Sequence, residues 1–315
     1  MPRGKCRVCG REAEYWVPWA NAWFCRDHYI EYYNRRIRRV WDKYFPEDPG
    51  DTLIAVSGGK DSVALLYSVS KILMEKGVHH SVLFIDLGIP GYSDESLEIV
   101  RWNAERLGLN VEIARLRGYG FTLRDIYRLV RARKIRRPVC SICGMIKRYL
   151  MNRYAYEHGY SLVLTGHNLD DMIGFTLSSL VSGRIEDLVK LRPYVEGYDN
   201  LVAKGKPLLF TYGVENKWYV EAIGARIVGA TCPFRTGESS VNTELRDAVF
   251  SVDEKHPGLA ILMVRNTVDK LIPRIKPSGQ TLIRCSVCGY PSSSDPCGFC
   301  RLRERVARLL SSEKK

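Results

Sequence analysis

The sequence predicts an α/β protein in which a doubly wound parallel sheet is flanked by a small cysteine-rich module at each end. Strand and helix patterns alternate along the middle of the chain, a glycine-rich turn joins the first of these strands to its helix, and short-spaced cysteine pairs mark both ends. At 315 residues the chain is long enough for about two domains of ~150 residues. We expect boundaries at 1–48, 49–276 and 277–315.

The composition is that of an ordinary globular protein with a strong positive charge. Hydrophobic residues make up 45% and charged residues 26% of the chain. No apolar run reaches ~18 residues, and the first ten residues hold no apolar signal segment, so we expect a cytoplasmic protein without a membrane span. The net charge of +13 favours a polyanionic partner, most simply nucleic acid. A soluble protein that is merely basic is the alternative.

The N-terminal cysteines have the spacing of a metal site. Cys6 and Cys9 form a C-x2-C pair and, after fifteen intervening residues, Cys25 and His28 form a C-x2-H pair. Two such pairs separated by a loop build a tetrahedral Zn2+ site. Such a module either contacts RNA or holds together a segment too short for its own core.

The C-terminal cysteines predict a zinc ribbon. Cys285, Cys288, Cys297 and Cys300 form C-x2-C-x8-C-x2-C, and the loop 291–296 between the pairs is rich in proline and serine. No packed element is expected in that loop, so the metal must hold it. The residues after the ribbon read as a charged tail.

A strand, a glycine turn and a helix follow one another at 52–77. Residues 52–56 read as a buried strand, 57–62 read SGGKDS, and 63–77 read as an amphipathic helix. Glycines let backbone amides approach an anion at a helix N-terminus, to which a lysine adds positive charge. Asp61 would serve Mg2+ or the helix start. The expected nucleotide-binding residues are Ala55, Val56, Ser57, Gly58, Gly59, Lys60, Asp61 and Ser62.

Further strands are expected at 80–86, 110–116 and around 160–165. Helices are expected between them at 93–108 and within 140–159, the second one after a turn that carries its two cysteines. Ser93 is the expected N-cap of the first of these helices. Ligands of a doubly wound sheet bind at the carboxyl ends of its strands, where Asp86, Gly166 and Asp171 would lie. We expect Asp170 or Asp171 to serve ATP or Mg2+ rather than only the helix dipole. Residues 215–275 read as helices that pack on the sheet or on a second subunit.

Three cysteines remain, and Cys140, Cys143 and Cys232 cannot complete a four-cysteine zinc site. They suit a metal site with one open position, a thiol pair with a resolving partner, or an iron–sulfur cluster with one iron free. Three unrelated buried cysteines are the structural alternative.

These motifs together resemble a known enzyme family. SGGKDS at the end of a strand resembles the PP-loop of the ATP-pyrophosphatases, which cut ATP between the α and β phosphates. Both cysteine modules, CSICGMIKRYLMNR, TGHNLDD and TCPF occur in the order found in tRNA 2-thiouridine synthetases of the TtuA type, and more distantly in the wobble-uridine thiolases. The resemblance covers nearly the whole chain.

The resemblance implies an ATP-dependent tRNA thiolase that adenylates the C2 carbonyl oxygen of a uridine and replaces it with sulfur. Cys140, Cys143 and Cys232 would hold a [4Fe-4S] cluster, with Lys147 and Asp171 near the reacting uridine. It also implies two Zn2+ ions, a Mg2+ ion with ATP, a ubiquitin-like sulfur-carrier protein as the thiocarboxylate donor, and a homodimer. Position 54 of the tRNA T-loop is the expected target. Wobble position 34 and a small-molecule acceptor are the alternatives.

Two basic stretches are candidates for the tRNA surface, because arginine beside aromatic residues favours phosphate contact with base stacking. The first runs through the helix at 32–41, where a solvated helix face is the alternative. The second precedes Cys140. Their members are Arg35, Arg36, Arg38 and Arg39, and Arg131, Arg133, Lys134, Arg136 and Arg137.

Overall fold

The computed structural model describes residues 4–235, 241–276 and 282–312. Its centre is a six-stranded sheet in the order β5-β4-β3-β6-β8-β7. All neighbours are parallel except β7, which runs antiparallel to β8 at one edge. The strands are β3 (Thr52–Ala55), β4 (His80–Asp86), β5 (Val111–Arg115), β6 (Leu162–Leu164), β7 (Tyr194–Val195) and β8 (Ala203–Gly205).

Successive residues of the central strands point to opposite faces of the sheet, and both faces are buried. Leu53, Leu83 and Val163 pack into one core, whereas Ile54 and Val82 pack into the other, all with 0% exposure. A strand covered on both sides needs no polar face, which explains the nearly continuous apolar runs in the sequence.

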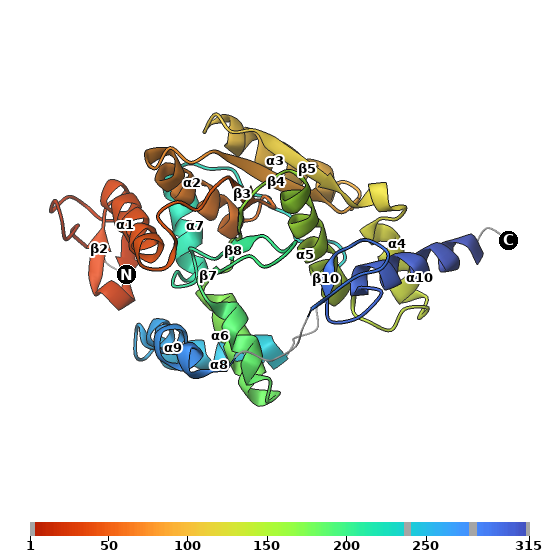
Figure 1. Ribbon diagram of the computed structural model, residues 1–315. Coiled ribbons are helices and arrows are strands. Elements are labelled where there is room, and N and C mark those ends of the chain that lie inside the picture. The colour runs from red at the N-terminus through yellow and green to blue at the C-terminus, as the bar shows by residue number, and fades with distance from the viewer. Residues whose placement is uncertain (1–3, 236–240, 277–281, 313–315) are drawn as a thin grey trace.

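Helices cover both faces of the sheet (Figure 1). One core gathers α1 (Arg26–Tyr44), α2 (Lys60–Glu75), α3 (Tyr92–Glu105) and α7 (Gly213–Ala222). The other gathers α4 (Leu123–Arg131), α5 (Val139–Glu157) and α10 (Gly298–Ser312). A parallel sheet between two helical layers confirms the predicted doubly wound α/β class.

Three further helices lie together below the sheet in Figure 1: α6 (Leu169–Val181), α8 (Val241–Asp253) and α9 (Leu259–Asn266). Short 3-10 turns occupy Pro18–Ala20, Leu116–Tyr119, Ile185–Leu191 and Ile272–Arg274, and a π turn occupies Thr267–Leu271. Two hairpins pair β1 (Tyr15–Val17) with β2 (Ala22–Phe24), and β9 (Ile283–Arg284) with β10 (Pro291–Ser292). None of the described helices is both long and apolar enough to span a membrane.

Four local expectations are corrected. Gly91, not Ser93, precedes α3, and the Ser93 hydroxyl instead accepts a hydrogen bond from the amide of Ile89 at 3.0 Å. The pair Cys140 and Cys143 lies in the first turns of α5 rather than before the helix. The expected tail forms α10 as far as Ser312, with Val306 fully buried against the sheet-facing helices. The apolar face of α10 was not recognised in the sequence because arginines are so frequent between its apolar residues.

The fourth correction concerns the first basic stretch. Arg36 is held by a short salt bridge to Glu215, whose side chain is 0% exposed, and by the carbonyl of Phe210 at 2.6 Å. Arg38 pairs with Glu75 on α2. Arg35 and Arg39 stay exposed, so only half of this stretch presents free charge to a partner.

Candidate nucleotide and thiol site

The central functional feature is a cavity of about 550 Å³ at the point where the strand order reverses, between β3 and β6. The chain connections leave this point in opposite directions, so the carboxyl ends of the two strands open a crevice between them. The walls come from β3, the start of α2, β4 and its following loop, α3, α5, the loop after β6, and the segment before α8. Its residues are Ala55, Val56, Ser57, Gly59, Asp61, Ser62, Leu83, Phe84, Ile85, Leu87, Ile89, Tyr92, Ser93, Ser96, Cys143, Lys147, Met151, Thr165, Gly166, His167, Asp171 and Cys232.

The loop from Ser57 to Gly59 brings the N-terminus of α2 to this cavity. Gly58 has φ +83°, a left-handed conformation that only glycine adopts readily. Ser62 fixes the turn, because its hydroxyl accepts from the amide of Ser57 at 3.1 Å and donates to the carbonyl of Gly59 at 2.9 Å. No side chain caps α2 at Gly59. Its first amides therefore remain available to an anion, reinforced by the helix dipole.

Asp61 links this helix end to two other elements. Its carboxylate accepts hydrogen bonds from Lys60 Nζ at 2.8 Å, from Asn168 Nδ2 at 2.9 Å, and from Asn216 Nδ2 on α7 at 2.8 Å. Three donors from three segments hold the carboxylate in one orientation. The network thus positions the ammonium of Lys60 beside the cradle.

The loop after β6 forms the opposite wall. Asn168 and Asp171 make a capping box at the start of α6, each side chain bonding the other residue's amide at 3.2 Å. Burial raises the pKa of Asp171 above its usual range. Burial, reinforced by the nearby Lys206 and Arg148, lowers the pKa of His167 to about 4, so its ring is neutral and pairs with Thr165 Oγ1 at 2.8 Å.

Gly166 lets this wall approach the cradle closely. A Cβ built there would lie 3.0 Å from backbone atoms of Asp61 and Ser62. The loop after β6 therefore packs against the backbone of the first turn of α2.

An apolar wall completes the nucleotide half of the cavity. Phe84, Leu87 and Ile89 line it from β4 and the loop that follows, opposite the polar cradle. A cavity with an anion cradle at one end and apolar side chains along one side suits a nucleotide, with its phosphates in the cradle and its base against the wall.

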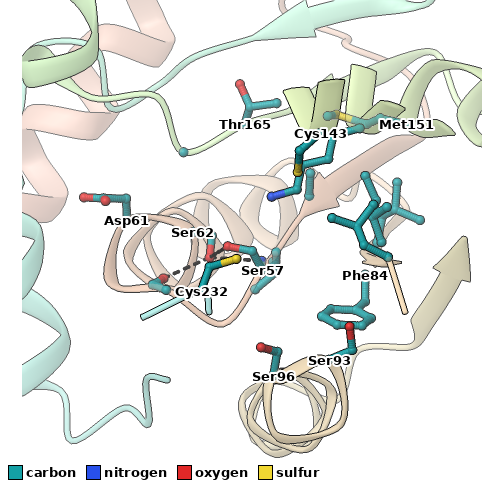
Figure 2. Close-up of a pocket in the computed structure, with 18 of the residues that line it drawn as sticks. Ser57, Asp61, Ser62, Phe84, Ser93, Ser96, Cys143, Met151, Thr165 and Cys232 are labelled. Carbon is teal, nitrogen blue, oxygen red and sulfur yellow. Dashed lines mark hydrogen bonds between the residues drawn. The ribbon is translucent and has the colours of Figure 1, made fainter. Parts of the chain in front are cut away.

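Two cysteines from distant parts of the chain point into the same cavity (Figure 2). Cys143 comes from α5, with Lys147 one helical turn further along and also in the lining. Burial raises the pKa of the Cys143 thiol, and the charge of Lys147 opposes that rise. Cys140 lies three residues earlier on α5 and is exposed.

Cys232 is brought to the cavity by a segment that crosses the glycine loop. The amide of Val228 donates to the carbonyl of Gly58 at 2.9 Å, and the ring of Phe234 stacks on Tyr127 of α4 at 4.5 Å. The segment is thus fixed on both sides of Cys232, which lines the cavity together with Ser57.

The spacing of these three thiols differs from that of a single-ion site. Within the described ranges, only the two terminal cysteine groups bring all their ligand atoms within 4.8 Å of one another. A cluster of four irons binds each cysteine at a different iron, so its ligands lie further apart than those of one zinc ion. Two of the thiols line one cavity and the third lies three residues away on α5, so three cysteines on two segments fit a cluster with one iron left open.

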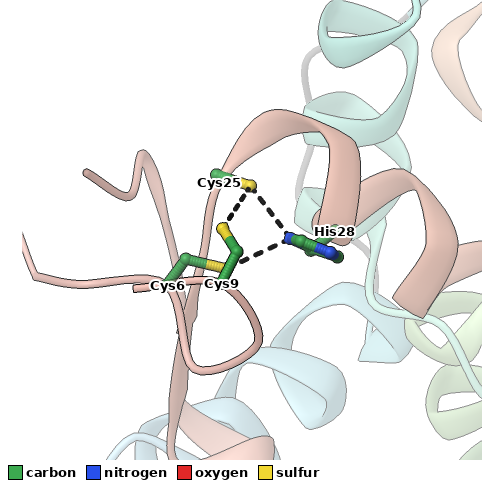
Figure 3. A group of neighbouring side chains, drawn as sticks. All are labelled: Cys6, Cys9, Cys25 and His28. Atoms are coloured by element: carbon green, nitrogen blue, oxygen red, sulfur yellow. Dashed lines mark hydrogen bonds between the residues drawn. The ribbon is translucent and has the colours of Figure 1, made fainter. Parts of the chain in front are cut away.

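The N-terminal group has the geometry of a tetrahedral site (Figure 3). Cys25 Sγ lies 3.2 Å from His28 Nδ1 and 3.8 Å from Cys9 Sγ, and Cys6 Sγ lies 3.5 Å from the same imidazole nitrogen. Arg11 contacts the sulfurs of Cys9 and Cys25, offsetting the charge that thiolates would carry.

The C-terminal group is likewise compact. Cys288 Sγ and Cys297 Sγ are 3.8 Å apart, and the amide of Cys297 donates to Cys285 Sγ at 3.2 Å. Next to Cys300, Phe299 stacks on Tyr149 of α5 with ring centroids 3.8 Å apart. The ribbon is thereby fastened to the helix that carries Cys140 and Cys143.

Some of the expected nucleotide residues lie beside the cavity rather than in its lining. The lining omits Gly58 and Lys60, which shape and charge the cradle, and also Asp86. The Asp86 carboxylate accepts from the amide of Gly88 at 2.8 Å and so closes its own turn. Sequence reasoning missed the roles of His167, Asn168 and Asn216. The first two lie in the quoted TGHNLDD, whereas Asn216 carries no sequence signal at all.

The chain matches two family models. Residues 31–190 match the PP-loop domain, and residues 5–30 match the N-terminal LIM domain of the 2-thiouridine synthetase TtuA.

Two relatives and one solved structure match nearly the whole chain. A tRNA-5-methyluridine(54) 2-sulfurtransferase of Pyrococcus horikoshii is 33% identical over 98% of this chain and 97% of its own length. The enzyme of the same name from Thermotoga maritima is 34% identical, over 96% of this chain and 97% of its own. Among solved structures, the U34-tRNA thiolase NcsA from Methanococcus maripaludis with its [4Fe-4S] cluster has a similar fold. Its TM-score is 0.77 at 23% identity, covering 96% of this chain and 97% of that one.

Proposed function

Because the chain belongs to the TtuA-type family of PP-loop tRNA 2-thiouridine synthetases, we propose that it is an ATP-dependent tRNA sulfurtransferase. It would adenylate the C2 carbonyl oxygen of uridine 54 in the tRNA T-loop and replace that oxygen with sulfur, releasing AMP and pyrophosphate. The observation that carries the proposal is one cavity lined by both the phosphate cradle and the thiols Cys143 and Cys232.

The cradle side would bind and activate ATP. The free amides of α2 and the ammonium of Lys60 favour the negative charge of the phosphates and of departing pyrophosphate. We assign ATP contacts to Ala55, Val56, Ser57, Gly58, Gly59, Lys60, Asp61, Ser62, Asp86, Gly166 and Asp171, with Mg2+ accompanying the phosphates.

The thiol side would deliver the sulfur. Cys140, Cys143 and Cys232 would hold the [4Fe-4S] cluster, and the thiolase NcsA, which carries such a cluster, has a similar fold. When bound, the cluster supplies a coordination position that the protein does not fill, where an incoming sulfur atom can be held. Lys147 lines the same cavity one helical turn after Cys143, so its ammonium would hold the uridine oxygen and its phosphate in line. Asp171 would act from the opposite wall.

The terminal modules and partners complete the proposal. Zn2+ would fill the site of Cys6, Cys9, Cys25 and His28 and that of Cys285, Cys288, Cys297 and Cys300. Segments 1–48, 49–276 and 277–315 would act as an N-terminal zinc finger with its helix, the catalytic domain and the ribbon module. We also propose a cytoplasmic homodimer that takes sulfur from the thiocarboxylate of a ubiquitin-like carrier protein.

Nucleoside mass spectrometry on an unmodified tRNA transcript tests the activity. The protein is reconstituted anaerobically with iron and sulfide and incubated with tRNA, ATP–Mg2+ and sulfide. We expect 2-thiouridine that nuclease fragments map to position 54, and its loss when uridine 54 is replaced by cytidine. Cys140→Ala should abolish thiolation but keep ATP affinity, because the cradle lies on other elements.

Each other outcome points to a different conclusion. Thiolation that maps to the anticodon identifies the wobble-uridine alternative. A protein that binds ATP and retains its cluster, yet yields no thiolated base with either sulfide or a carrier thiocarboxylate, contradicts the proposal and favours another acceptor. Loss of ATP affinity in Cys140→Ala contradicts the separation of the two halves.

A further inference from the structure

A second groove, of about 540 Å³, runs between α5 and α10, outside the cavity described above. Its floor is apolar, with Ile142 and Met145 from α5 and Leu302 from α10. Its rim carries four arginines: Arg137 before α5, and Arg301, Arg305 and Arg308 on α10. The arginines of α10 recur at steps of four and three residues, which places them on one helix face.

Most of this positive charge is not neutralised within the protein. Arg137 donates to Ser141 Oγ at 2.9 Å, Arg301 to Ser294 Oγ at 2.8 Å and Arg305 to the carbonyl of Lys134 at 2.7 Å. These acceptors carry no charge. Among the described residues, no carboxylate forms a salt bridge with any of these three guanidinium groups. Arg308 pairs with Glu304 at 3.8 Å, but both side chains are about 70% exposed, so this pair holds the charge weakly.

The groove adjoins the thiol site across a single helix. Ile142 and Met145 line the groove, whereas Cys143 and Lys147 on the same helix line the nucleotide cavity. Cys140 is exposed in the first turn of α5, between Arg137 and Cys143. An RNA strand held in the groove would therefore lie beside the helix that carries Cys140 and Cys143.

We propose that this groove binds the phosphate backbone of the tRNA substrate and so holds the RNA while the target base enters the cavity. This inference rests on the proposed function, since it takes tRNA as the substrate. Arginine forks match phosphate oxygens bidentately. The lining offers no Asn or Gln side chain to read base edges. The groove thus contributes affinity and register but little sequence preference.

Three variants test the proposal: Arg305→Gln, the double variant Arg305→Gln/Arg308→Gln, and the control Arg303→Gln. Arg303 is exposed on the same helix but does not line the groove, so its substitution removes the same charge from a different face. The assays are tRNA affinity as a function of salt, ATP affinity, and thiolation kinetics of the reconstituted full-length protein. Circular dichroism and zinc content verify that the ribbon and α10 remain folded.

Each lost phosphate contact should lower the slope of log affinity against log salt by about 0.7–0.9. At 0.1 M salt this corresponds to a roughly five- to eightfold loss of tRNA affinity for Arg305→Gln and roughly 25- to 60-fold for the double variant. KM for tRNA should rise accordingly. ATP affinity and the thiolation rate at saturating tRNA should remain near wild type. Arg303→Gln should match wild type throughout, and the losses should be similar for tRNAs of different sequence.

Two results would overturn the inference without touching the proposed function. The first is a wild-type protein that thiolates tRNA while the groove variants keep its affinity and salt slope. The second is unchanged tRNA binding with slower turnover only when a carrier protein supplies the sulfur, which would make a protein the occupant. If wild type neither binds nor thiolates tRNA, the proposed function itself fails.

Discussion

Gly166→Ala probes the contact between the two loops that form the nucleotide site. The added Cβ would lie 3.0 Å from the carbonyl carbon and oxygen of Asp61 and from the amide nitrogen of Ser62. All three atoms belong to the backbone of the first turn of α2, so no side chain can rotate away to make room. Overpacking of this kind costs about 1–3 kcal/mol of stability.

The same displacement should weaken ATP binding, because the amides of that turn form the cradle. We expect a fall in Tm of roughly 2–4 °C for each kcal/mol lost, and an ATP Kd at least about tenfold higher, equivalent to ~1.4 kcal/mol. Thermal unfolding and isothermal titration calorimetry measure the two effects.

Gly118→Ala is the matched control. A Cβ built at Gly118 meets no atom within 4 Å, and the residue lies outside the cavity lining. This variant should keep both Tm and ATP affinity. If Gly166→Ala behaves like Gly118→Ala, the close packing of the two loops does not position the cradle, and our account of the site is wrong.

Three further predictions concern pH, a buried ion pair and metal content. Burial lowers the pKa of His167 to about 4, so the unfolded chain takes up a proton before the folded protein does as pH falls below ~6.5. The free energy of unfolding should therefore decline between pH 6.5 and 4 by up to about 3 kcal/mol. Urea unfolding should show a shallower decline for His167→Asn, whose zinc sites are the same. Glu215→Gln should lower the free energy of unfolding by about 3–5 kcal/mol, because Arg36 is left buried without its partner. Asp187→Asn, which breaks an exposed pair with Lys190, should change it by less than about 1 kcal/mol. Equal losses in the two variants would contradict the assigned role of burial. Metal analysis should find two zinc ions per chain, one of which is lost in Cys25→Ser and the other in Cys297→Ser. Cys297→Ser should also raise hydrogen exchange in α10, whose Phe299 is held against Tyr149. Two zinc ions in either variant would refute the assigned ligands.

The local motifs of this chain could be identified from the sequence because their physics is local. Glycines next to a lysine at a strand end dictate a turn that exposes amides, whatever surrounds them, and SGGKDS forms that turn here. A metal site needs two short-spaced ligand pairs, so Cys6, Cys9, Cys25 and His28 could be grouped by spacing alone. The apolar runs of the strands likewise identified a sheet buried on both faces.

The sequence misled where a charged side chain has a distant partner. Arg36 lies in an arginine-rich stretch typical of a nucleic-acid surface, yet it is buried against Glu215, 179 positions away. Asn216 gave no signal, although its amide holds Asp61 across 155 positions. The arginines of α10 were interpreted as part of a solvated tail. The apolar residues between them are buried only because α5 provides a surface on which they pack, and the sequence alone does not show that contact.

The sequence by itself determined the parts: an anion cradle, two metal-binding groups, three further thiols and a parallel sheet. Only the tertiary structure decided how they combine. The reversal of strand order between β3 and β6 opens the crevice, and the segment that crosses Gly58 carries Cys232 into it from far along the chain. The physical reason is that turns and ligand pairs depend on a few neighbouring residues, whereas a shared cavity depends on long-range packing, which a single sequence does not display.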